Sequence, residues 1–131
     1  MEEHYVNFEI AKMLKAKKFY LPCRHWFDAN GTVSQKYLNP EFPINYDNVP
    51  YFVQPTCGSV MYWLREKYKI IISPYYTSIG WYYEINSMID SDITGCKSLY
   101  SIGIPSKEQV KENYEDAVEE AIKYTLEHFI N

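Results

Sequence analysis

Apolar residues recur at helical spacing in three stretches of the chain. In the first stretch Ile10, Ala11 and Leu14 fall on one face of a predicted helix. Asn7 stands where a capping residue is expected, and the pattern ends near Lys17. The middle stretch carries an apolar stripe made of Val60, Trp63, Leu64 and Tyr68. We therefore predict two amphipathic helices before residue 70, and we expect the second stripe to lie in the core.

The third helical stretch follows Pro105. Ser106 and Gln109 have the spacing of a capping box, which predicts that the last helix begins there. Its apolar side would carry Val110, Tyr114, Ala117, Val118, Ala121, Ile122, Leu126 and Phe129. The opposite side is rich in glutamate, a pattern typical of a helix face in contact with water.

An Asn30–Gly31 pair indicates a β-hairpin between the first two helices. A two-residue loop would set Phe27 opposite Ser34, whereas a three-residue loop with Gly31 left-handed would pair Phe27 with Val33. We favour the second register, which gathers on one face Cys23, His25, Phe27 and Val33. The other face then carries Arg24, Trp26, Asp28, Thr32, Ser34 and Lys36.

Residues 39–55 contain four prolines, which break both helices and inner strands. Five large apolar side chains in the same segment argue against a flexible linker: Phe42, Ile44, Tyr46, Tyr51 and Phe52. We expect a long ordered loop and no domain boundary. Either this loop covers the ring of Trp26 through Tyr46 or Phe52, or the ring is left for a partner, and we expect the second outcome.

Alternating patterns predict strands at residues 70–77 and 81–89, with a third short strand at 99–104. In the second strand we expect the face that carries Trp81, Tyr83 and Ile85 to lie in the core. The element order is then helix, hairpin, helix, two or three strands, helix. It predicts one α+β domain over residues 1–131, with helices packed on one side of an antiparallel sheet.

Composition narrows the function classes. The chain has 131 residues, of which 47% are hydrophobic and 23% charged, as in globular domains. Its net charge of -4 disfavours binding to duplex nucleic acid. The acidic N-terminus is unlike a signal peptide and no apolar run is long enough to span a membrane, so we expect a cytoplasmic protein without membrane contact.

Candidate chemistry is sparse. Cys23, Cys57 and Cys96 are odd in number and widely spaced, which predicts reduced thiols rather than disulfides or a zinc site. The segment Asp90-Ser91-Asp92 lacks the glycine and glutamate of a calcium loop. We therefore assign no metal and no cofactor. Cys57, in the first turn of the middle helix, could act as a nucleophile with His25 as its base, which keeps a thiol enzyme as one alternative.

Three groups of residues carry a resemblance to known proteins. They are Phe8-x-x-Ala11-x-x-Leu14-Lys15 with Phe19 and Pro22-Cys23, Pro55-Thr56-x-x-x-Val60-x-x-Trp63-Leu64-Arg65-Glu66-Lys67-Tyr68, and Tyr114-Glu115-x-Ala117 with Ala121-Ile122-Lys123. The chain resembles, over nearly its whole length, short uncharacterised proteins of gut Bacteroidetes and their phages. That resemblance implies a phage or prophage accessory protein in the host cell and carries no catalytic residue. The chain departs from it at Lys18, where a glycine helix cap is expected.

Fourteen tyrosines point to recognition, because their rings offer large contact areas at a low cost in side-chain entropy. Our first hypothesis is a non-enzymatic protein that binds a host protein or itself. Its expected contact residues are Trp26 and part of the group Tyr75, Tyr76 and Tyr82. The alternative is a small-ligand binder, for example a sponge for a nucleotide immune signal. Its rings would stack on a base, and Arg24, Lys36 or Arg65 would meet phosphate.

Overall fold

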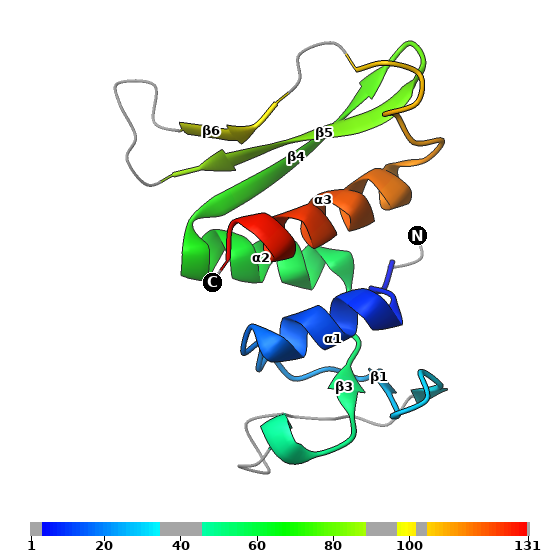
Figure 1. Ribbon diagram of the computed structural model, residues 1–131, viewed down its shortest axis with the longest axis vertical. Helices are drawn as coiled ribbons and strands as arrows, with labels where there is room; N and C mark the ends of the chain where they lie inside the picture. The colour runs from blue at the N-terminus through cyan, green and yellow to red at the C-terminus, as the bar shows by residue number, and fades with distance from the viewer. Residues whose placement is uncertain (1–3, 35–45, 89–96, 102–104, 131) are drawn as a thin grey trace. The chain divides into compact units, whose positions relative to one another are not determined.

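A computed structural model describes residues 4–34, 46–88, 97–101 and 105–130 of the chain. Within these ranges the chain forms three α-helices and two three-stranded antiparallel sheets (Figure 1). The predicted α+β class is therefore confirmed, with the strands divided between two sheets. The chain forms two compact units, Met1–Cys57 and Gly58–Ile130. The expectation of one domain over residues 1–131 stays a prediction.

The first unit begins with helix α1 (Phe8–Ala16). Its predicted start is confirmed, because the Asn7 side chain accepts a hydrogen bond of 2.9 Å from the Ile10 amide. The helix ends in a Schellman motif, in which the Phe19 amide donates to Leu14 and the Lys18 amide to Lys15. Lys18 takes the left-handed position, with φ at 66°, that glycine usually fills.

The sheet of the first unit contains β1 (Trp26–Phe27), β2 (Val33–Ser34) and β3 (Phe52–Val53). Strand β1 lies in the middle of the order β2-β1-β3. The predicted hairpin register is confirmed, since Phe27 pairs with Val33 and Gly31 has φ at 82°. A three-residue loop with a left-handed glycine thus closes the hairpin, as the Asn-Gly pair predicted.

Part of the proline-rich segment forms regular structure, which corrects the expectation of a loop alone. Strand β3 pairs with β1, and a short 3-10 helix, η1 (Tyr46–Asn48), precedes it. Pro50 and Pro55 flank the two residues of β3 instead of interrupting them, so both strand amides keep their protons. Helix α1 packs against β3. Phe42 and Ile44 lie outside the described residues.

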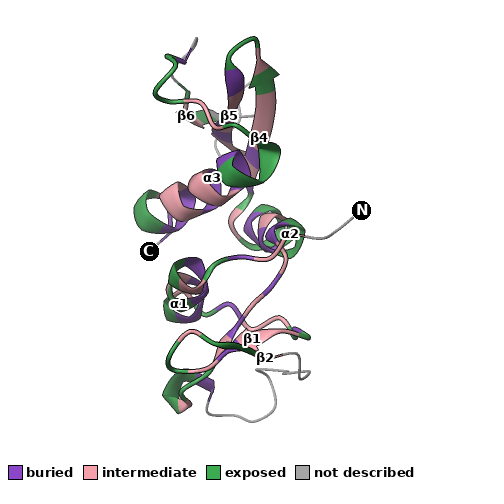
Figure 2. Cartoon of the chain, turned by 90° about the vertical axis from the view of Figure 1, so that its right-hand side faces the viewer, coloured by how far each residue is buried: buried purple, intermediate pink, exposed green. Residues whose placement is uncertain are grey.

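The second unit contains α2 (Cys57–Tyr68) from its second residue onward, then β4 (Ile70–Thr77), β5 (Gly80–Ser87), β6 (Lys97–Tyr100) and α3 (Tyr114–His128). The sheet order is β4-β5-β6, and α3 packs against β4 and β5 (Figure 1). Helix α3 buries one side and exposes the other (Figure 2). Its buried residues are Ala117, Val118, Ala121, Ile122, Thr125 and Leu126. This unit thus has one helix-on-sheet core.

The strands of the second unit follow their predicted positions closely. Strand β4 has the predicted bounds, and β5 starts one residue earlier than expected. Strand β6 ends at Tyr100, whereas residues 102–104 of the predicted third strand lie outside the described residues. Trp63 and its neighbours Val60 and Leu64 are buried, so the predicted stripe of α2 is confirmed at these positions, while Tyr68 at its end is half-buried.

The last helix begins at Tyr114 rather than at Ser106, which corrects the capping-box prediction. Ser106 and Gln109 do bond to each other, but they close only a turn. The reason is that Trp81 and Lys111 exchange backbone hydrogen bonds of 2.7 and 2.8 Å. An extended backbone at Lys111 cannot be helical, so the helix starts later, where the Asn113 side chain accepts from the Asp116 amide.

Gly80 is required where Val110 and Lys111 approach the hairpin. A Cβ atom at Gly80 would lie 2.8 Å from the Lys111 carbonyl oxygen, and φ there is 147°. We expect Gly80→Ala to lower the free energy of unfolding by about 2–3 kcal/mol through overpacking and strain. Chemical denaturation measures that loss, and faster hydrogen exchange at the Lys111 amide would locate it. Ser78→Ala, in the same turn, is the matched control and should have little effect.

Trp63 anchors the buried stripe of α2. We expect Trp63→Ala to lower the free energy of unfolding by about 3–5 kcal/mol, because a large core ring is lost. Urea denaturation followed by circular dichroism measures the change. The adjacent Tyr62 is 52% exposed, so Tyr62→Ala serves as the control and should change stability by less than about 1 kcal/mol. Equal losses in the two variants would contradict a core position for Trp63.

Candidate functional site

Trp26, the first expected contact residue, is partly covered by its own chain. Tyr51 packs against it edge-on, with ring centres 4.8 Å apart, and Trp26 is half-buried. The ring is thus partly covered by its own chain, and a role for its open part in binding stays a prediction. The covering residue is Tyr51 rather than Tyr46 or Phe52. Strand β3 pairs with β1 through Trp26 and Val53, and this pairing carries the preceding Tyr51 to the Trp26 ring.

Exposed rings gather instead at the end of the β4–β5 hairpin. Tyr76, Trp81 and Tyr114 form what we call the aromatic row. The Trp81 ring centre lies 5.3 Å from that of Tyr76 and 5.4 Å from that of Tyr114, and both contacts are edge-on. Tyr76 is 66% exposed and Tyr114 43%, while Trp81 is half-buried between them. The three rings thus present one connected aromatic surface.

Local structure explains how the aromatic row assembles. Tyr76 and Trp81 are cross-strand partners, which places their side chains on the same face of the hairpin. Tyr114 is the first residue of α3. Because Lys111 pairs with Trp81, the nearby Tyr114 lies against the Trp81 ring. Trp81 was expected on the core face of its strand together with Tyr83 and Ile85. Those two residues are buried, whereas Trp81 is half-buried. Tyr114 was expected on the apolar side of the last helix, but it is 43% exposed because α3 starts at this residue.

A second group of rings, the tyrosine cluster, consists of Tyr82, Tyr83, Tyr100 and Tyr124. Tyr83 stacks on Tyr82 and on Tyr100, with ring centres 4.7 and 5.5 Å apart, and the Tyr82 and Tyr100 hydroxyls share a hydrogen bond. Tyr82 is only 2% exposed, so it is no longer a candidate for an exposed contact. Tyr75 is half-buried and packs edge-on against Tyr82.

A cavity of about 300 Å³ adjoins the tyrosine cluster. Its lining residues are Tyr82, Tyr83, Tyr100, Glu108, Gln109, Lys111, Glu120 and Tyr124. Burial raises the pKa of Tyr82 and Tyr83 above the ordinary value, and the negative charge of Glu120 adds to both shifts. The phenols therefore stay neutral at physiological pH and can donate hydrogen bonds to a small molecule. Lys111 and Glu120 form an ion pair of 3.1 Å in the same wall.

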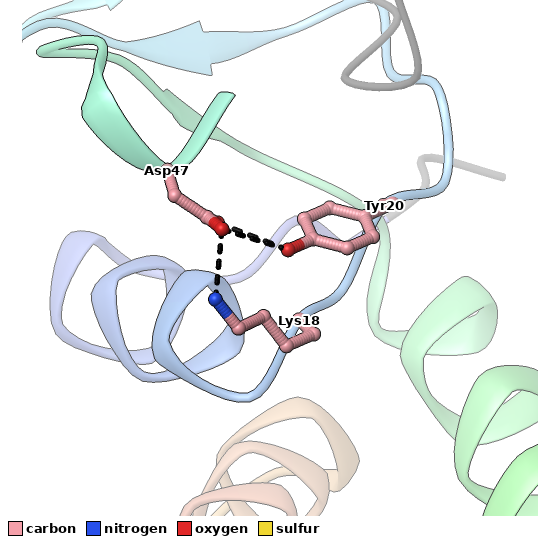
Figure 3. A network of polar contacts seen from close by, with 3 residues as sticks. All are labelled: Lys18, Tyr20 and Asp47. Atoms are coloured by element: carbon pink, nitrogen blue, oxygen red, sulfur yellow. Dashed lines mark hydrogen bonds and ion pairs between the residues drawn. The ribbon is translucent and has the colours of Figure 1, made fainter. Parts of the chain in front are cut away.

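The first unit has a cavity of about 380 Å³, which we call the lysine pocket. Its lining residues are Lys12, Lys15, Ala16, Lys18, Asp47, Val49 and Phe52. In Figure 3 the Lys18 ammonium and the Tyr20 hydroxyl meet at the Asp47 carboxylate, at 2.7 and 3.0 Å. These hydrogen bonds, with that from Lys18 the larger cause, hold the pKa of Asp47 below its ordinary value.

Lys15 is buried at the base of the lysine pocket. Its ammonium donates hydrogen bonds to the Val49 and Tyr51 carbonyl oxygens and lies over the rings of Tyr46 and Phe52. Burial lowers the pKa of Lys15, and the attraction of Asp47 opposes that shift. A charge-assisted clamp of this kind joins α1 to residues 46–52. No sequence pattern pointed to it, because its acceptors are backbone carbonyls.

The structure describes two of the three basic residues expected to meet phosphate. Arg24 and Arg65 are exposed, and Lys36 lies outside the described residues. The Arg65 guanidinium is 5.4 Å from the Tyr62 ring centre and 3.7 Å from a Glu66 carboxylate oxygen. Arg24 belongs to the first unit and Arg65 to the second. Nucleotide binding through these three side chains stays a prediction.

The thiol-enzyme alternative depends on whether the Cys57 sulfur is accessible to a substrate. Cys57 is the first residue of α2, as expected, and its amide donates a 2.8 Å hydrogen bond to the His4 carbonyl oxygen. The side chain is buried, as is that of Cys23. His25 packs its ring against Tyr5, with centres 4.3 Å apart. A thiol closed off from solvent is poorly placed to attack a substrate.

The described residues fall in the ranges 4–34, 46–88, 97–101 and 105–130. Within these ranges no group of three or more His, Cys, Asp or Glu side chains could hold a metal ion. Within the same ranges no helix is both long enough and apolar enough to cross a membrane. The Asp90-Ser91-Asp92 segment lies outside them. The candidate sites are therefore the aromatic row and the two cavities.

The Cys23 thiol makes stability depend on alkaline pH. Burial raises its pKa from 9.0 to about 12, so its contribution is complete below pH 9 and is lost as pH rises toward 12. We expect the wild type to lose about 2 kcal/mol more between pH 8 and 10.5 than Cys23→Ala does. Urea denaturation at both pH values measures this difference. Identical losses in the two proteins would show that the folded thiol ionises normally.

Comparisons with known proteins assign no family to this chain. No protein-family model, no curated protein and no solved structure matches the chain. The relation to phage and gut Bacteroidetes proteins accordingly stays an expectation drawn from the sequence motifs. What the structure contributes is three local arrangements: a connected row of exposed rings, a tyrosine-lined cavity and a lysine-lined cavity.

Proposed function

We propose that this protein is a non-enzymatic binding protein that recognises another protein through the aromatic row. The observation that carries the proposal is the connected surface of Tyr76, Trp81 and Tyr114, in which Tyr76 is 66% and Tyr114 43% exposed. Tyrosine and tryptophan dominate the binding energy of protein interfaces. Connected exposed aromatic surface on a soluble domain commonly marks such an interface.

The surroundings of the aromatic row suit an interface. Ile79, in the turn of the same hairpin, is 49% exposed and adds aliphatic surface at that end of the sheet. Charged residues flank the row, with Lys111 paired to Trp81 through the backbone and Glu115 next to Tyr114. An apolar centre with a charged margin is the usual composition of a protein interface. The rings also hold one another in place, which reduces the entropy lost on binding.

The proposed partner is a host protein or a second copy of this chain. An accessory role for a phage or prophage, inside the host cytoplasm, rests on the resemblance of the sequence motifs alone. Duplex nucleic acid is a poor partner, since the chain has a net charge of -4 and the row contains rings rather than basic side chains.

Photo-crosslinking tests this proposal. A photo-reactive amino acid replaces Tyr76 in one protein and Tyr62 in a matched control, because both tyrosines are exposed in the same unit. In host cells we expect a specific product, either a homodimer or one host protein, from position 76 only. Trp81→Ala should reduce that product at least tenfold, the effect of losing one interface hot spot. Equal products from the two positions, or none from position 76, would overturn the proposal.

Sedimentation velocity of the purified protein then separates the two partners. A homodimer should appear as concentration increases and should weaken in Trp81→Ala. A protein that stays monomeric throughout, with a host protein crosslinked at position 76, identifies the heterologous partner.

Small-ligand binding is a second candidate function, supported by the cavity beside the tyrosine cluster. Neutral phenols, the Gln109 amide and the Lys111–Glu120 pair offer both donors and acceptors around about 300 Å³. That volume is at the lower end of the range for small-molecule sites. Native mass spectrometry of protein purified from its own host would reveal a retained molecule, and Tyr124→Ala should release it. A mass equal to that of the chain alone would count against this candidate.

A further inference from the structure

The lysine pocket concentrates positive charge in a chain that is negative overall. Lys12, Lys15 and Lys18 line it with one carboxylate, that of Asp47, while the whole chain carries a net charge of -4. The backbone positions of Lys12 and Lys18 lie about 9 Å apart along α1 and its cap. Flexible lysine side chains on such a spacing can converge on one anion.

The three lysines differ in what already holds them. Lys15 is held by the Val49 and Tyr51 carbonyl oxygens, which fix its charge without neutralising it. Lys12 lies over the Phe8 ring at 4.7 Å and, within the described part of the chain, makes no ion pair. Lys18 pairs with Asp47, and both side chains are about half exposed. The pocket therefore has one fixed charge and two that an anion can engage.

Lys18 stands out because its backbone is strained. It occupies the left-handed position after α1, with φ at 66°, where glycine is the usual residue. A non-glycine residue there carries a steric penalty, and such penalties are often found at functional positions. The observed consequence is an ammonium group at the edge of the pocket, hydrogen-bonded to Asp47 (Figure 3).

The other wall of the lysine pocket is apolar. Phe52, Val49 and the Ala16 methyl group face a volume of about 380 Å³, within the range of small-molecule sites. An inorganic anion alone would make no apolar contact with this wall. The combination calls for a ligand that carries negative charge at one end and a planar or aliphatic group at the other.

We propose that the lysine pocket binds a small phosphorylated molecule. Lys12 and Lys18 contact the phosphate, with Lys15 as a fixed charge beneath it, and the organic part packs against Phe52 and Val49. In the absence of ligand the Asp47 carboxylate pairs with the Lys18 ammonium group. This ion pair must break when Lys18 contacts the phosphate. Asp47 thus competes with the phosphate for Lys18. Removing the Asp47 charge should therefore strengthen phosphate binding, whereas removing the charge of Lys12 or Lys18 should weaken it.

Phenyl phosphate is a suitable probe, with phenol and inorganic phosphate as its two halves. Chemical-shift titration of the backbone amides measures binding, and the signals of Lys18 and Asp47 should shift. We expect phenyl phosphate to bind more tightly than either half. Lys12→Gln and Lys18→Gly should each weaken binding about fivefold, and Asp47→Asn should strengthen it by a similar factor. Lys18→Gly relieves the left-handed strain, so this variant keeps its fold.

Lys17→Gln is the matched control. It removes one positive charge from the same helix end, but Lys17 does not line the lysine pocket. The control should bind phenyl phosphate as the wild type does. Weakening by Lys17→Gln equal to that by Lys18→Gly would show diffuse attraction by surface charge rather than a site. Weaker binding by Asp47→Asn, equal affinity for phenol and phenyl phosphate, or no shift at Lys18 would each overturn the proposal.

Discussion

The backbone pairing of Trp81 with Lys111 is the interaction on which the second unit depends. It holds residues 110–111 in an extended conformation beside the hairpin and so postpones the start of α3 to Tyr114. The close approach is possible because Gly80 has no Cβ in the space that Val110 and Lys111 occupy. One pair of hydrogen bonds thereby determines both the length of the last helix and the position of its first ring. The aromatic row exists as a consequence, since Tyr114 completes it.

A buried ammonium group has the corresponding role in the first unit. Lys15 connects α1 to residues 46–52 through two carbonyl oxygens and two rings. Neither carbonyl is an anion, so the charge is hydrogen-bonded but not neutralised, and burial lowers the Lys15 pKa as a result. The same residue therefore does two things. It fastens β3 to the helix, and it supplies a fixed positive charge at the base of a pocket whose edges are Lys12 and Lys18.

Aromatic residues serve different purposes in different places, which explains why their number alone could not identify a site. Tyr82 lies inside the tyrosine cluster and contributes to packing, whereas Trp26 is only half-covered by Tyr51. Tyr76 keeps its expected exposure because it lies near the end of a two-stranded hairpin, where no described helix covers it. Whether a ring packs or is presented depends on what lies across from it, and that neighbour is often distant in sequence.

Local sequence signals determined the α+β class, the Asn7 cap, the Phe27–Val33 register, strand β4 and the buried stripe of α2. Each rests on residues within about one turn or one hairpin of each other, where steric and hydrogen-bonding preferences act directly. Tertiary structure alone decided the start of α3, the place of Trp81 in the aromatic row and the partial covering of Trp26. In each of these cases a non-local strand pairing, Trp81 with Lys111 or Trp26 with Val53, overrode the local preference. Backbone hydrogen bonds depend little on which side chains are present, so the sequence gives little indication of such pairings.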